Sequence, residues 1–97
     1  MANWYHNYKI AEKRLLTVRD WLIENPIPEN EIQRNLRGKC MLPENFRYQQ
    51  GADYLWSVIS PLGDSVGVNE MTQDFACKRA YQLIDVLTSM FVSVSTN

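Results

Sequence analysis

The sequence predicts an all-α domain, and two amphipathic segments at the ends of the chain carry that prediction. Near the N-terminus, apolar residues recur at alternating spacings of four and three, at Trp4, Tyr8, Ala11, Leu15, Val18 and Leu22. Near the C-terminus, a similar spacing gives a stripe of Ala76, Ala80, Leu83, Leu87, Met90 and Val94. Such spacings keep side chains on one face of a helix. We therefore expect three to four helices, with long N- and C-terminal helices packed antiparallel and shorter elements between them.

The size and composition of the chain fit one domain over residues 1–97. A chain of 97 residues is too short for two cores, and its 45% of hydrophobic residues can fill one core without a metal or a disulfide. Cys40 and Cys77 have no CxxC neighbour. That pattern favours two buried thiols in a reducing cytoplasm over a structural disulfide.

Proline and glycine mark the expected ends of the first two helices. The first helix should end near Asn25, because Pro26 disfavours a helical backbone in the residue before it and has no amide hydrogen to donate. A short second helix should follow, with Pro28 at its first position and Gly38 as a left-handed stop.

The middle of the chain is ambiguous between helix and strand. Residues 39–50 are expected to be mostly loop. Residues 52–60, ADYLWSVIS, alternate like a strand but also fit a helix, and the long helices on either side favour a helix. A hairpin over residues 45–59 is the alternative, which would make the domain α+β. Residues 61–68, PLGDSVGV, contain two glycines and are expected to form an exposed turn or loop.

The last helix is the clearest element. Asn69 or Thr72 can cap its N-terminus, and Asp74 is placed to pair with Lys78 four residues later. Cys77, Tyr81, Ile84 and Phe91 lie beside the apolar stripe and widen it. A surface this wide is typical of a central helix, or of one that also meets a partner.

The residues that catalysis and metal binding require are scarce. His6 is the only histidine, so any Ser-His or Cys-His arrangement would depend on a residue near the chain end. Neither zinc-ligand spacing nor a phosphate-binding glycine motif is present. Paired carboxylates such as Asp53 with Asp64, or Asp74 with Asp85, are the one remaining route to an enzyme, and any chain this acidic offers such pairs. The sequence therefore predicts no enzyme, no cofactor and no metal.

One segment combines basic and aromatic residues. Residues 33–50, QRNLRGKCMLPENFRYQQ, interleave Phe46 and Tyr48 with the basic side chains of Arg34, Arg37, Lys39 and Arg47. Cations bind phosphates and aromatic rings stack on bases, so this patch could engage single-stranded nucleic acid. Against this, the formal net charge is −1, and Arg34 and Arg37 could simply pair with the acidic residues around Glu29.

Protein recognition is the function that this composition favours. Trp, Tyr and Phe make up 11% of the chain, and aromatic residues dominate binding energy at protein interfaces. Trp4 and Tyr8 should anchor the first helix in the core, which leaves Tyr5 and His6 as exposed candidates. The predicted partner-binding residues are Tyr5, His6, Arg34, Arg37, Lys39, Arg47 and Tyr48.

The sequence therefore predicts a non-enzymatic helical module that binds another protein or complex stoichiometrically, as a regulator, inhibitor or adaptor. Self-association through the surface from Cys77 to Val94 is a variant of this hypothesis. The alternative is a nucleic-acid-associated protein that uses the patch at residues 34–48. We expect a cytoplasmic protein, because the start lacks a signal-peptide pattern and no segment approaches the ~20 consecutive apolar residues of a membrane span.

Overall fold

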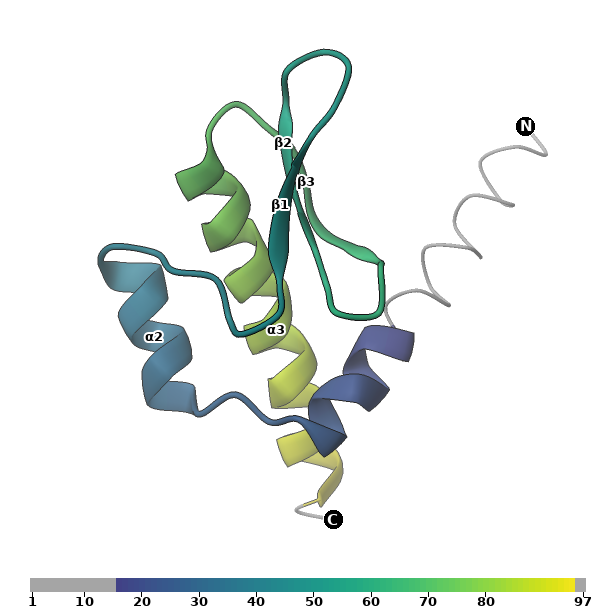
Figure 1. The fold of residues 1–97 in the computed structure, drawn as a ribbon. Helices are drawn as coiled ribbons and strands as arrows, with labels where there is room; N and C mark the ends of the chain where they lie inside the picture. Colours follow the sequence, from purple (N-terminus) through teal and green to yellow (C-terminus); the bar gives the residue numbers. More distant parts are fainter. Residues whose placement is uncertain (1–15, 96–97) are drawn as a thin grey trace, which may run out of the picture.

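A computed structural model describes residues 16–95, which form helices and one antiparallel sheet in two layers (Figure 1). A helical segment over residues 16–24 comes first. It is followed by α2 (Glu29–Arg37), β1 (Arg47–Gln50), β2 (Trp56–Ile59), β3 (Ser65–Glu70) and α3 (Gln73–Ser95). The fold is α+β, so the all-α prediction is wrong, and the alternative with a hairpin over residues 45–59 is correct. Trp4, Tyr8, Ala11 and Leu15 lie outside the described residues.

The three strands form a meander in the order β1-β2-β3. In the first hairpin Tyr48 pairs with Val58 and Gln50 pairs with Trp56. The rings of Tyr48 and Trp56 meet edge to face, with their centroids 6.2 Å apart. The helix predicted for residues 52–60 is therefore wrong, because aromatic and β-branched side chains gain more by packing across strands than a helix offers them.

The expected loop over residues 61–68 is also wrong in its second half, which belongs to β3. The turn is confined to residues 60–64, where Gly63 has a φ of 89°. Gly67 is a strand residue that pairs with Val58. A Cβ atom on Gly67 would lie 2.5 Å from the Ala76 carbonyl oxygen and 3.1 Å from the Ala80 amide nitrogen. This glycine therefore allows close contact between β3 and α3, and the turn does not depend on it.

The core lies between the sheet and the helices, with α3 at its centre (Figure 1). Helix α3 packs against β2, β3 and α2, and its buried residues are Ala76, Cys77, Ala80, Tyr81, Ile84 and Leu87. Val18 and Leu22 add the buried face of the first helical segment. Between Ala76 and Leu87, the apolar surface of α3 is thus largely covered by the rest of the fold.

Two of the predicted helix ends are confirmed, at Asn25 and at Thr72, whereas Pro28 is the residue before the first position of α2. The first helical segment stops before Asn25, and the Thr72 hydroxyl accepts the Phe75 amide hydrogen at 3.1 Å. The predicted ion pair is also confirmed, because Asp74 pairs with Lys78 at 3.9 Å.

The prediction of a left-handed stop at Gly38 is wrong, because its φ of −126° is not left-handed. Its amide instead donates to the Arg34 carbonyl, so a residue with a side chain could also occupy this position.

Replacing Gly67 with alanine should destabilise the fold. The new methyl group would meet helix backbone that cannot rotate away, so β3 and α3 would have to separate. We expect a loss of about 1–3 kcal/mol in the free energy of unfolding, measured by urea denaturation. Gly38→Ala is the matched control, because its Cβ would meet only the Arg34 carbonyl oxygen at 3.6 Å. Equal stability of the two variants would contradict this account of Gly67.

Candidate functional site

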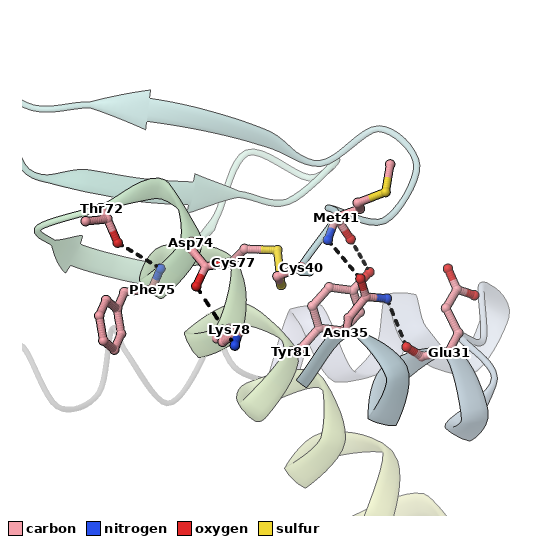
Figure 2. The surroundings of a disulfide bond; sticks show 10 residues. All are labelled: Glu31, Asn35, Cys40, Met41, Thr72, Asp74, Phe75, Cys77, Lys78 and Tyr81. Atoms are coloured by element: carbon pink, nitrogen blue, oxygen red, sulfur yellow. Dashed lines mark hydrogen bonds and ion pairs between the residues drawn. A yellow bond between two sulfur atoms is a disulfide. The ribbon is translucent and has the colours of Figure 1, made fainter. Parts of the chain in front are cut away.

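The loop between α2 and β1 is covalently joined to α3. A disulfide links Cys40 to Cys77, with the two Cα atoms 6.1 Å apart, inside the range that a disulfide can span (Figure 2). The prediction of two free thiols is therefore wrong. The distance between the two cysteines in space is determined by the packing of the loop on α3. Their separation along the sequence does not reveal it.

Hydrogen bonds also hold the residue next to Cys40. The Tyr81 hydroxyl donates to the Met41 carbonyl oxygen at 2.6 Å, and the Met41 amide donates to the Asn35 side-chain oxygen at 2.8 Å. The Asn35 side-chain nitrogen in turn donates to the Glu31 carbonyl oxygen at 2.9 Å. Tyr81 and Asn35 are both buried. We call residues 38–42 the clamped loop, because α2 and α3 both fix its backbone (Figure 2).

Burial raises the pKa of the Tyr81 hydroxyl further above the physiological range, where the phenol is protonated and able to donate. Desolvation is the largest influence, with a smaller one from the charge of Glu31, and together they raise the pKa of Tyr81 to about 12. A neutral phenol is the form that can donate to a carbonyl. The bond to Met41 is thus present throughout the physiological pH range.

The side chain of Met41 is exposed although its backbone is fixed. It is 66% exposed and points away from α2 and α3 (Figure 2). It lies on the edge of a groove of about 440 Å³. This α2 groove is lined by Glu31, Arg34, Asn35, Gly38, Lys39, Met41 and Leu42.

Two of the predicted partner-binding residues, Arg34 and Lys39, line the α2 groove, and Arg37 ends the same helix. All three side chains are exposed. None of them forms a salt bridge with another residue in the range 16–95. The expected pairing of Arg34 and Arg37 with the acidic residues near Glu29 is therefore not found.

The other predicted residues lie elsewhere. Arg47 and Tyr48 are consecutive on β1, so their side chains point to opposite faces of the sheet. Tyr48 is half-buried, and desolvation followed by the charge of Asp74 raises its pKa. Phe46 is buried, with its ring 5.7 Å from that of Trp21. The basic-aromatic patch is thus divided, and Tyr5 and His6 lie outside the described residues.

A second surface, which we call the apolar end, consists of Tyr54, Met71 and Phe75. Their exposed fractions are 77%, 82% and 60%. Trp56 pairs with both Gln50 and Glu70, so the β1–β2 turn and the connection from β3 to α3 leave the sheet at the same end. Glu70 also pairs with Arg79 of α3 at 3.1 Å. Tyr54 and Met71 therefore extend into solvent from one end of the sheet, and Phe75 does so from the first turn of the helix that follows.

Sequence reasoning missed the apolar end, although Phe75 carried a usable signal. It shares a helix face with Arg79 and Gln82, both exposed, and not with the buried stripe. The sequence around Tyr54 carried no such signal, because the position of Tyr54 depends on the β1–β2 turn. Its φ of 66° is uncommon for a residue with a bulky side chain.

The pKa of one carboxyl on α3, that of Asp85, is influenced by Glu29 of α2. Burial is the first cause that raises the pKa of Asp85, followed by the charge of Glu29 and a hydrogen bond with the Glu29 side chain. No three His, Cys, Asp or Glu side chains within residues 16–95 are grouped to hold a metal ion. Over the same residues, no helix is both long enough and apolar enough to cross a membrane.

Comparison of the chain with protein-family models, with curated proteins and with solved structures finds no match.

Replacing Asp85 with asparagine should stabilise the fold at neutral pH. The pKa of Asp85 is raised in the folded state, so below its unfolded value near 4 the carboxyl is neutral in both states and has no effect on stability. As the pH rises through the folded pKa, ionisation destabilises the folded state. We expect Asp85→Asn to raise Tm by about 2–4 °C at pH 7, corresponding to about 0.5 kcal/mol, and to leave Tm unchanged below about pH 4.

Thermal unfolding followed by circular dichroism from pH 3 to pH 8 measures this difference. Glu44→Gln, at an exposed carboxyl in the turn before β1, is the control. A gain for Asp85→Asn that is equally large at pH 3 would show that the charge of Asp85 is not its cause.

Proposed function

We propose that this chain is a non-enzymatic module that binds another protein stoichiometrically, as a regulator, inhibitor or adaptor. The observation that supports this proposal best is the apolar end. Tyr54, Met71 and Phe75 are more than half exposed. Tyr54 and Met71 belong to two connections at one end of the sheet, and Phe75 lies in the first turn of α3. Burying each of them against a partner would contribute roughly 1.5–3 kcal/mol.

The positions of these side chains suit a preformed interface. The Thr72 hydroxyl caps α3 by accepting the Phe75 amide hydrogen, and the Glu70–Arg79 ion pair joins β3 to the same helix. The turn that carries Tyr54 is closed by a bond from the Gly51 amide to the Leu55 carbonyl at 2.9 Å. Ordered contacts lower the entropic cost of binding, so this surface can bind without first folding.

Self-association through the surface from Cys77 to Val94 has little support. Cys77, Tyr81 and Ile84 are buried inside the fold, so they are not available to a second copy. Nucleic-acid association also loses part of its basis. Phe46 is buried and Tyr48 packs on Trp56, so these rings are poorly placed to stack on bases.

The disulfide bears on where the protein works. Disulfides persist in oxidising compartments and are rare in the cytosol. We therefore propose that the chain works where Cys40–Cys77 stays oxidised, in place of the cytoplasmic location expected from the sequence. Alkylation of the protein as isolated from its host, followed by measurement of the intact mass, should show no labelled cysteine. Two labelled cysteines would contradict this location.

The variant Tyr54→Ser/Phe75→Ser should lose the partner and keep the fold. Both side chains are exposed, so their removal should change the free energy of unfolding by less than about 1 kcal/mol. At the centre of an interface, loss of an aromatic side chain typically costs 2 kcal/mol or more, so each of the two replacements should weaken binding by about thirtyfold or more.

The measurement is affinity purification from the native host, followed by titration calorimetry with the protein that co-purifies. Val86→Ser is the matched control, because Val86 is exposed on α3 about three turns beyond Phe75. If the double variant and Val86→Ser retain the partner equally, the apolar end is not its binding surface.

A further inference from the structure

We infer that the α2 groove binds an acidic segment of a protein partner, with one apolar side chain of that segment held against Met41 and Leu42. This surface is distinct from the apolar end, and the inference goes beyond the proposed function. It rests on three properties of the α2 groove: unpaired cations, an exposed apolar residue and a fixed backbone.

Two basic side chains line the α2 groove. Arg34 and Lys39 line it, Arg37 is close by at the end of α2, and none of the three has a carboxylate partner among residues 16–95. Basic residues in the last turn of a helix interact favourably with the helix dipole, which explains their position. The helix dipole does not provide hydrogen-bond acceptors for the guanidinium and ammonium donors. These donors therefore remain available for bidentate or single contacts with carboxylates.

The α2 groove also offers an apolar surface. The exposed Met41 side chain and the half-buried Leu42 line it beside Lys39. Methionine is flexible and polarisable, so it adapts to apolar side chains of different shapes. A segment that carries both a carboxylate and an apolar residue would therefore meet complementary groups.

The backbone of the α2 groove is already ordered. The Met41 amide and carbonyl are both hydrogen-bonded, and Cys40 is joined to α3. A ligand would therefore order only side chains and its own chain. Glu31 is the acidic residue among those that line the groove, and it repels an acidic group placed beside it. The carboxylates of the segment should then lie near Arg34 and Lys39.

Selection of a random library of 12-residue peptides displayed on phage, using the full-length oxidised chain as the target, tests this inference. Enriched peptides should contain Asp or Glu together with Leu, Met or Phe. A synthetic peptide of the enriched sequence should bind at least about tenfold more weakly to Arg34→Glu/Lys39→Glu, as fluorescence anisotropy would show. Met41→Ser should also weaken binding, since it removes the apolar contact and leaves the backbone hydrogen bonds.

Two controls keep this test separate from that of the proposed function. Arg47→Glu reverses an exposed charge that does not line the α2 groove, and it should leave the affinity unchanged. Tyr54→Ser/Phe75→Ser should likewise bind the peptide normally, even though it should lose the host partner. Enrichment without acidic residues, no enrichment, or an affinity unaffected by Arg34→Glu/Lys39→Glu would each overturn the inference. Displacement of the peptide by a single-stranded 20-nucleotide DNA would also overturn it, in favour of phosphate binding.

Discussion

The attachment of the clamped loop to α3 joins the end of α2 to the central helix of the fold. Cys77 and Tyr81 lie about one turn apart on α3, and they bind consecutive residues of the loop, Cys40 and Met41. Asn35 bonds the same loop to α2 from the other side. Helix α3 therefore fixes the path of the chain between the end of α2 and the start of β1. The α2 groove exists because this path is fixed.

The sequence predicted elements well where local signals decide the structure. Pro26 ends a helix through its own ring, and Thr72 caps α3 through its own hydroxyl, so both positions could be predicted from neighbouring residues alone. The sheet depends on contacts between distant residues. Trp56 and Val58 alternate as a strand does, but only their pairing with β1 and β3 makes the strand favourable over a helix.

Gly67 illustrates the same limit for a single residue. In sequence it belongs to a turn-like stretch with a second glycine, and glycine is common in turns. In the fold Gly67 lies against the backbone of α3, so closely that a residue with a Cβ atom would not fit without a shift of the backbone. Exposure of charged residues such as Arg34 and Lys39 is easier to predict, because charged side chains are rarely buried. The apolar end was missed because exposure of Tyr54 and Met71 follows from the shape of the connections.

The position of the disulfide has a consequence for the integrity of the chain. Cys40 precedes β1 and Cys77 follows β3, so the covalent ring contains all three strands and both of their turns. A protease that cuts the exposed turn at residues 51–54 would leave two fragments held together by the sulfur bridge and by the core. Such a nicked chain would keep its mass in a non-reducing gel and separate only after a thiol reagent is added.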